Sequence, residues 1–240
     1  MSALENKQIK HMNKRNTKIL AITAIAVVAG FFIYNKTQGS EINSELSFGF
    51  TTDSHQRGVI YSGEGLDSGI SVSTEIFDSF DLGLSFDAKK AFDQEDDTQF
   101  GVEVGASVFE DVNLGLGFVA YNGHNYLDGE SEVYLEVSGL DLPLDPSLTA
   151  YYNADREWWT FEGSVGHSVK VFGQDVAVSA FAGSTETSSL DSHVYYGGEA
   201  SVSHSLSDDL DLKLGITYVD TDSTLLDREF IFSAGLTTRF

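Results

Sequence analysis

From Ser44 to the C-terminus, apolar side chains alternate with polar or small ones in short segments that recur along the chain. The last segment shows this most clearly. From Phe230 to Phe240 every second residue is Phe, Ala, Leu or Thr, and most of the residues between them are polar or Gly. A period of two residues predicts a β-strand with one apolar and one polar face. An apolar face toward lipid, a polar face toward a wet lumen and a terminal aromatic are typical of the last strand of an outer-membrane barrel.

Twelve segments of this kind are predicted between residues 44 and 240. Their apolar faces are rich in Val, Leu, Ala and Phe, and residues that favour turns separate them. An even number of strands is typical of bacterial single-chain barrels. The predicted fold class is therefore all-β: a transmembrane antiparallel up-and-down β-barrel of about 12 strands, preceded by an N-terminal signal segment.

The connections between these segments alternate in length. Short ones, such as 77–79 and 207–209, alternate with longer polar ones, such as 54–67 and 123–130. Both prolines fall in the connection 141–146, where a missing amide hydrogen removes no sheet hydrogen bond. Short periplasmic turns and long extracellular loops alternate in the same way, so we expect both ends of the barrel chain on the periplasmic side.

Aromatic residues fall near many predicted strand ends. Amphipathic rings favour the headgroup zone of a membrane, so this placement predicts aromatic girdles at its two interfaces. The alternative is that aromatic residues are simply common in strands. The residues assigned to the girdles are Phe50, Phe77, Phe80, Tyr152, Trp158, Trp159, Phe172, Tyr218 and Phe240.

Residues 1–40 differ in character from the rest of the chain. Basic residues precede an apolar run from Ile19 to Tyr34, which is the order of a secretory signal. A run of about 16 residues is at the short limit for a spanning helix. We therefore expect residues 1–40 to be a signal peptide or an uncleaved N-terminal anchor, and residues 41–240 to form the outer-membrane β-barrel.

The chain is strongly acidic, with a formal net charge of −23, and it has no Cys. Basic side chains outnumber acidic ones in residues 1–40, so the excess of carboxylates lies in the predicted barrel. Nucleic-acid binding needs basic patches, and we expect no nucleic-acid partner. The acidity favours either solubility in a salty medium or a lumen that attracts cations.

Two stretches, residues 51–62 and 218–240, resemble the opening and closing motifs of the TorF family of porins. The resemblance extends over residues 44–240 and implies a Gram-negative outer-membrane barrel that acts as a channel. It implies no particular substrate. The residues that carry it are Asp53, Arg57, Gly58, Asp220, Asp222, Asp227, Arg228 and Phe240.

The face opposite each apolar face predicts the interior of the barrel. Acidic residues outnumber basic ones there, and the small side chains between them leave room for water. Rings of carboxylates favour cations over anions, which predicts a narrow, cation-preferring pore. A barrel of 12 strands lies between filled and open ones in size, so a plugged interior is the alternative. The acidic residues assigned to the lumen are Glu45, Glu75, Asp81, Glu103, Glu132, Glu136, Glu162, Glu199 and Asp211.

Three tyrosines, Tyr134, Tyr151 and Tyr195, fall on the same inward face. With Asn113 and Asn153 they would line a sugar- or nucleoside-like site, or they would simply fill the interior of the barrel.

Catalytic motifs are missing from the predicted strands. A phospholipase-type barrel pairs a His with a Ser two residues later, and no His after residue 41 has this neighbour. Neither a defined metal-ligand cluster nor a Gly-rich phosphate loop is present. We therefore expect a protein that is not an enzyme and that uses neither a metal nor a cofactor.

The predicted function is that of a porin-like channel in the outer membrane of a Gram-negative bacterium. It would let small cationic or neutral solutes diffuse through an acidic lumen. Its partners would be outer-membrane lipid and, through the C-terminal strand, the barrel-assembly machinery. The alternative is a non-conducting structural or surface-interaction barrel.

Overall fold

The computed structural model describes residues 42–57, 59–76, 80–92, 96–109, 112–123, 129–139, 144–171, 174–186, 192–222 and 228–240. The predicted signal segment therefore lies outside the described residues, as do Gly58, Phe77, Phe172 and Asp227. The chain divides into two units, Met1–Ile42 and Asn43–Phe240, and nearly all of the described residues belong to the second. In the described part of the chain, no helix has the length and apolarity needed to span a membrane.

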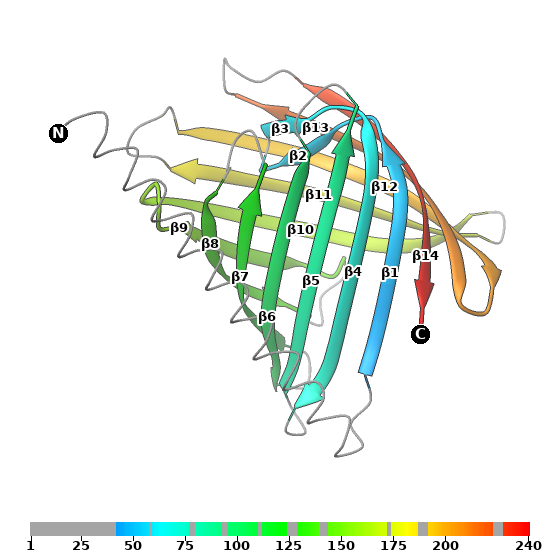
Figure 1. The fold of residues 1–240 in the computed structure, drawn as a ribbon. Coiled ribbons are helices and arrows are strands. Elements are labelled where there is room, and N and C mark those ends of the chain that lie inside the picture. The colour runs from blue at the N-terminus through cyan, green and yellow to red at the C-terminus, as the bar shows by residue number, and fades with distance from the viewer. Residues whose placement is uncertain are drawn as a thin grey trace. The chain divides into compact units, whose positions relative to one another are not determined.

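Twelve antiparallel strands form one closed barrel, which confirms the predicted fold class and strand number (Figure 1). Each strand pairs with its neighbours in the chain, and β14 closes the ring by pairing with β1, with Phe48 opposite Leu236. The barrel strands are β1 (Ile42–Thr51), β4 (Gly65–Ile76), β5 (Phe80–Ala91), β6 (Asp97–Phe109), β7 (Val112–Asn122), β8 (Ser131–Ser138), β9 (Ser147–Asn153), β10 (Trp158–Val171), β11 (Gln174–Glu186), β12 (His193–Ser207), β13 (Leu210–Thr221) and β14 (Glu229–Arg239).

A short hairpin, β2 (Ser54–Gln56) and β3 (Val59–Ser62), interrupts the connection between β1 and β4. It forms a sheet of its own and is not part of the barrel wall. The prediction of a plain polar loop over residues 54–67 is wrong here, because β-forming residues at 59–61 allow local strand pairing. β4 also starts before the predicted strand, at Gly65, because it pairs with β5 as far as Ala91.

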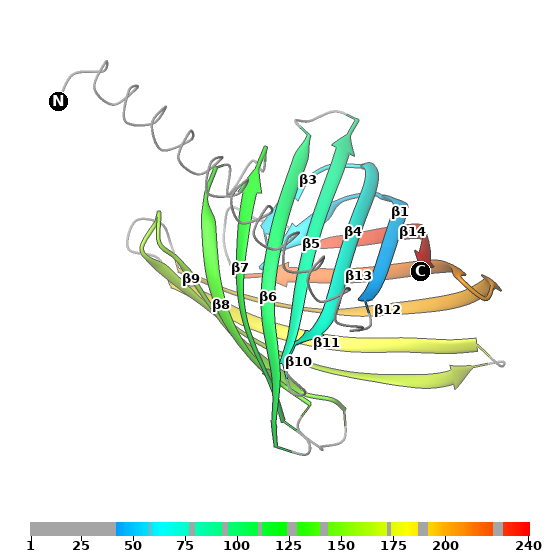
Figure 2. The ribbon, with the colours of Figure 1, turned by 60° about the horizontal axis from the view of Figure 1, so that its bottom comes forward.

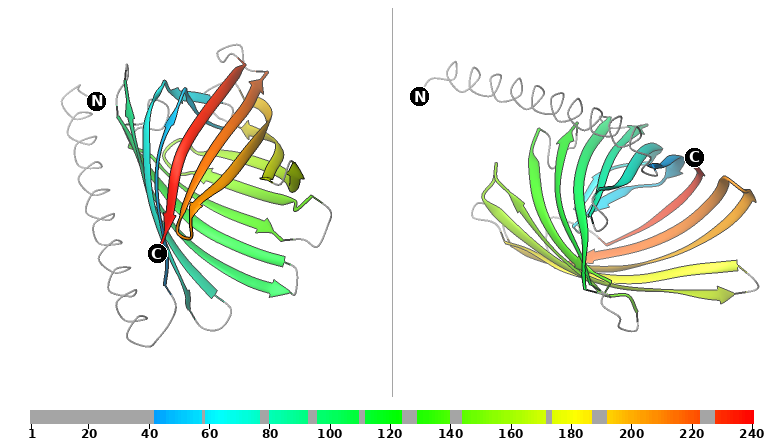
Figure 3. Two further views of the ribbon diagram at one scale, coloured as in Figure 1. Left: turned by 90° about the vertical axis from the view of Figure 1, so that its right-hand side faces the viewer. Right: turned by 90° about the horizontal axis from the view of Figure 1, so that it is seen from below.

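The barrel has two distinct ends. At the loop end lie the connections between β1 and β4, β5 and β6, β7 and β8, β9 and β10, β11 and β12, and β13 and β14. At the turn end lie the other connections and the start of β1, next to the C-terminus. Figures 2 and 3 show β4–β8 on one wall of the barrel and β10–β13 on the opposite wall. We call the two halves of the interior the loop half and the turn half.

The predicted alternation of faces is present in the barrel. Outward residues are exposed, such as Leu116 at 62% and Leu148 at 61%. Inward residues toward the loop end are buried, such as Tyr195 at 0% and Val219 at 1%. The exposed apolar face is what a strand in contact with lipid needs.

The two consecutive tryptophans of β10 lie on opposite faces of the strand. Trp159 is outward and lies 4.8 Å from the ring of Tyr152, as expected of a girdle residue. Trp158 is buried inside, where the Arg156 guanidinium lies 4.7 Å from its ring. The assignment of Trp158 to a girdle is therefore wrong, because consecutive residues of a strand point to opposite faces.

Candidate functional site

The hairpin between β1 and β4 folds into the loop half of the barrel. Arg57, at its tip, forms a salt bridge with Glu132 of β8, and both side chains are buried. The guanidinium carbon lies 3.9 Å from the centre of the Tyr151 ring on β9. In the strand order, β8 and β9 lie far around the ring from β1 and β4. The hairpin therefore crosses the interior rather than following the wall.

Other contacts hold the same hairpin on several sides. Gln56 donates a hydrogen bond to the Tyr121 hydroxyl of β7, and the His55 ring stacks on Phe181 of β11 at 5.6 Å. The backbone oxygen of Arg57 lies 3.3 Å from Nε2 of His193 on β12. On β5, the Lys89 ammonium donates to the Ser54 hydroxyl at 2.7 Å. The docked hairpin thus narrows the interior at the loop end.

Burial and charge set the ionisation of the hairpin residues. Burial by itself lowers the pKa of Arg57, but the hydrogen bond and the charge of Glu132 outweigh it and leave this pKa above its ordinary value. Burial lowers the pKa of His55, and attraction to Glu199 offsets part of that effect. Burial raises the pKa of Asp53. Arg57 is therefore a fixed cation, whereas a neutral His55 favours the docked hairpin.

The three predicted inward tyrosines lie in the interior, where two of them donate to carboxylates. The Tyr195 hydroxyl donates to Glu162 at 2.7 Å, and the Tyr134 hydroxyl donates to Glu103. Tyr151 packs against Tyr134 at 5.7 Å and under Arg57. These contacts are the ones expected if the tyrosines fill the interior of the barrel, and the sugar- or nucleoside-like site stays a prediction.

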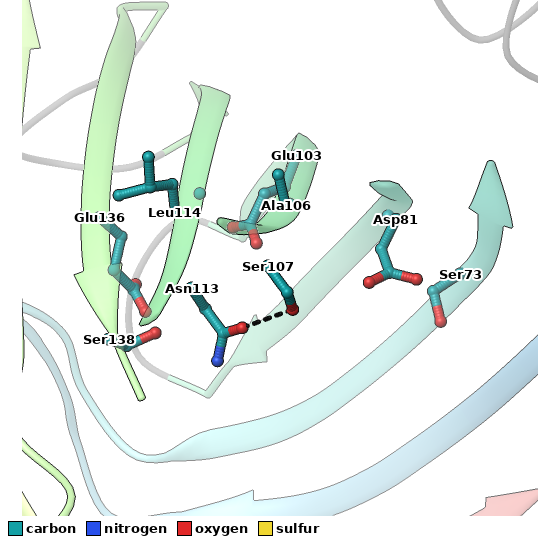
Figure 4. A pocket seen from close by; sticks show the side chains of 12 residues that line it. Ser73, Asp81, Glu103, Ala106, Ser107, Asn113, Leu114, Glu136 and Ser138 are labelled. Carbon is teal, nitrogen blue, oxygen red and sulfur yellow. Dashed lines mark hydrogen bonds between the residues drawn. The ribbon is translucent and has the colours of Figure 1, made fainter. Parts of the chain in front are cut away.

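The turn half contains a cavity of about 250 Å³ along the inner wall of β4–β8. Figure 4 shows the carboxylates of Asp81, Glu103 and Glu136 turned toward this space from β5, β6 and β8. Asn113 accepts a hydrogen bond from Ser107 at 2.8 Å beside them. Within the described part of the chain, none of these three carboxylates has a basic partner within 4.0 Å. This wall therefore carries unpaired negative charge.

Predicted lumen acids on the remaining strands have other surroundings. Arg239 bridges Glu45 at 3.1 Å and Asp211 at 2.8 Å, and Lys213 lies 3.7 Å from Glu199. Basic side chains on β13 and β14 therefore pair with acids on β1, β12 and β13. Glu75 on β4 lies directly opposite Asp81 on β5, so two like charges are neighbours on the wall with the cavity. The nine predicted residues form an unpaired set and a paired set rather than one ring.

The residues of the family motifs do not gather at one place. Arg57 lies inside, whereas Asp220 accepts hydrogen bonds from Tyr196 and Tyr218 at 3.0 and 2.9 Å near the loop end. Asp222 accepts from the Val194 amide at 2.7 Å. Asp53 and Arg228 flank strands at the loop end, and Phe240 at the turn end exchanges backbone hydrogen bonds with Ser44. Gly58 and Asp227 lie outside the described residues. The motifs therefore support the barrel at several places and form no single site.

Comparison with known proteins gives similarity in fold alone. No family model matches the chain, and no curated protein matches it. Among solved structures, a KdgM porin aligns with a TM-score of 0.55 at 12% identity, over 82% of this chain and 99% of the porin. A NanC porin aligns with a TM-score of 0.53 at 10% identity, over 81% of this chain and 98% of the porin.

An outer membrane channel from Pseudomonas putida F1 aligns with a TM-score of 0.52 at 10% identity, over 84% of this chain and 95% of the channel. Because the identities are low, these alignments establish the barrel fold and leave the resemblance to the TorF family a prediction. The chain thus has the fold of porin-like outer-membrane barrels.

Proposed function

We propose that this protein is a channel of the Gram-negative outer membrane that passes small cations and small neutral solutes. The observation that carries the proposal is a closed barrel with an exposed apolar exterior and an interior wall of unpaired carboxylates. Lipid covers such an exterior, and water fills such an interior. The loop end faces the medium and the turn end faces the periplasm, in line with the usual lengths of barrel connections.

Cation preference follows from the uneven charge of the interior. Asp81, Glu103 and Glu136 line a cavity whose wall has no described basic partner, whereas Arg239 and Lys213 are paired with acids. In a narrow interior with low-dielectric walls, fixed negative charge raises the local concentration of cations and opposes anions. We therefore assign the path of cations to the wall formed by β4–β8.

Current through single barrels in a planar bilayer tests this function. Under a salt gradient we expect discrete steps and a reversal potential of the sign for cation selectivity. The double change Glu103→Gln and Glu136→Gln removes two charges from the path and should move the reversal potential toward zero. The matched control, Asp208→Asn with Asp209→Asn, removes two charges from the turn between β12 and β13 and should have little effect. An unchanged reversal potential in the first variant would refute the assigned path.

The docked hairpin favours a second candidate, a non-conducting structural or surface-interaction barrel. Arg57 and Glu132 are buried together in the loop half, as in a plug. A correctly inserted barrel that stays silent at every voltage would support this candidate. In both candidates the protein is not an enzyme, lipid surrounds the barrel, and the strand that ends at Phe240 engages the assembly machinery.

A further inference from the structure

A second cavity, of about 190 Å³, lies on the inner wall near the loop end, over β4, β5 and β6. It is separate from the cavity of Figure 4 and shares no lining residue with it. Three carboxylates line it, from Asp67, Asp87 and Asp97, together with one ammonium group, that of Lys89. Its walls therefore carry an excess of negative charge.

The register of the strands sets these charges in a row. Lys89 of β5 lies directly opposite Asp67 of β4 on one side and Asp97 of β6 on the other. Its ammonium donates to Ser54 of the hairpin at 2.7 Å. One cation therefore already lies between two carboxylates and is also bound to the hairpin.

Asp97 retains an unused oxygen. The residue is only 6% exposed, and its Oδ1 has no hydrogen-bond partner. A buried carboxylate oxygen without a donor is costly, because the water it has lost is not replaced. Since Asp97 lines the cavity, a donor placed in the cavity would supply the missing partner.

The third carboxylate is accommodated by a glycine. Asp87 lies opposite Gly69 in the register, and a Cβ at position 69 would collide with Oδ1 of Asp87 and with the Ser47 hydroxyl. The glycine thus leaves room for an acidic side chain to lie along the wall beside β1. Asp87 is half-buried and adds a second acceptor to the same space.

We propose that this cavity binds the primary ammonium group of a small cationic solute. The wall already holds an alkylammonium, that of Lys89, so the chemistry of the site suits this group. Ammonium N–H groups form charge-assisted hydrogen bonds with carboxylates such as Asp97 and Asp87. Among the described residues the carboxylates do not form a three-ligand metal cluster, and the cavity is larger than a bare ion.

This inference names a solute class for the proposed channel and in that sense rests on it, but binding can be measured without conduction. Titration calorimetry on the full chain in detergent micelles, with 1,4-diaminobutane as the probe, should detect saturable binding. Butan-1-ol, which lacks the charge, should give none. Asp97→Asn removes the charge of the carboxylate whose Oδ1 has no partner and should weaken binding about tenfold or more.

Matched variants separate the site from the general acidity of the lumen. Asp87→Asn changes a second lining carboxylate and should weaken binding in the same direction, so the test survives if Asp97→Asn does not fold. Asp81→Asn removes the same charge from the turn-half cavity and should leave binding unchanged within about twofold. Mobility of the unheated barrel on a denaturing gel checks the fold of each variant.

Three outcomes would overturn the proposal: no binding to the folded wild-type chain, equal weakening by Asp81→Asn and Asp97→Asn, or binding of magnesium ions with none of the diamine. A silent barrel that still binds the diamine would contradict the proposed channel and leave this site standing. A conducting barrel that fails to bind would contradict the site alone.

Discussion

The loop half and the turn half of the barrel share one wall but have different interiors. In the loop half, Arg57, Glu132 and Tyr195 are buried, and the hairpin occupies the space between the walls. In the turn half, Glu75 and Asp81 are exposed, and Asp81 lines a cavity. Along the wall strands, inward and outward side chains alternate in the same way in both halves. The difference therefore comes from the inserted hairpin together with large inward side chains of the wall, such as Tyr195.

The carboxylates of the two halves also differ in their hydrogen-bond partners and in their exposure to water. In the loop half the buried Glu132 accepts hydrogen bonds from a guanidinium and from a tyrosine hydroxyl, and the half-buried Glu162 accepts one from Tyr195. In the turn half carboxylates remain within reach of water. Buried charges need partners, whereas solvated ones do not. The loop half is thus the more tightly filled part of the interior, and the turn half holds the unpaired carboxylates on which the proposed cation preference rests.

The largest expected effect comes from Arg57→Met. The change leaves the buried Glu132 charge without its partner, and loss of one member of a buried pair costs about 3–5 kcal/mol. We expect the hairpin to leave the interior, so that the urea midpoint of the folded barrel falls and the unit conductance rises. Tryptophan fluorescence and bilayer recordings measure the two effects.

Arg239→Met is the matched control in the turn half. Its salt bridges to Glu45 and Asp211 are open to solvent on the side of the exposed Arg239, and pairs of that kind contribute about 0–1 kcal/mol. We expect little change in the urea midpoint and no opening of the loop end. Equal effects of the two substitutions would remove the distinction between the halves.

A smaller effect is expected from adding a methyl group to an inward glycine. In the loop half, a Cβ at Gly183 would collide with the Tyr195 ring, which lies opposite it on β12. Overpacking of this kind costs about 1–3 kcal/mol, and here it would also displace the ring from Glu162.

Gly83 in the turn half is the control for this change. A Cβ there meets nothing within 4 Å, so Gly83→Ala should be neutral or slightly stabilising. Urea unfolding of the two alanine variants compares the packing of the halves directly. A larger loss from Gly83→Ala than from Gly183→Ala would contradict a tightly packed loop half.

The strands of the barrel wall could be predicted from the sequence because each one is encoded by a local alternation of apolar and polar residues. Alternation with a period of two assigns a face to every residue of a strand, and Leu116, Leu148 and Tyr195 lie on the predicted faces. The number of strands follows from counting the segments. Trp158 shows the weakness of reasoning from residue type, because an aromatic near a strand end suggests a girdle although the alternation places this one inside.

The docking of the hairpin could not be predicted, because it depends on contacts between distant residues. Nothing near Arg57 in the sequence indicates that its partner is Glu132, 75 positions away. A weak signal is present: Glu132 lies at the start of β8 on the same inward face as Tyr134, where a buried carboxylate needs hydrogen-bond donors. In the same way the row Asp67, Lys89 and Asp97 becomes visible only when three strands are placed in register.

The smallest expected effect concerns pH and the His55 ring. Burial lowers the pKa of His55, so the docked hairpin favours the neutral imidazole, and its stabilisation is complete above the ordinary pKa of about 6.5. As the pH falls below that value toward the lowered pKa, the released hairpin takes up the proton more readily and docking weakens. Bilayer recordings at about pH 5 should show a two- to tenfold larger open fraction than recordings at about pH 7.5.

His55→Phe keeps a ring to stack on Phe181 and should abolish this dependence on pH. His167→Phe, a change of an exposed outward residue on β10, should preserve it. A pH response that persists in His55→Phe would assign the sensitivity to another group, such as Asp53, and would leave the Arg57 salt bridge as the main contact that keeps the loop half closed.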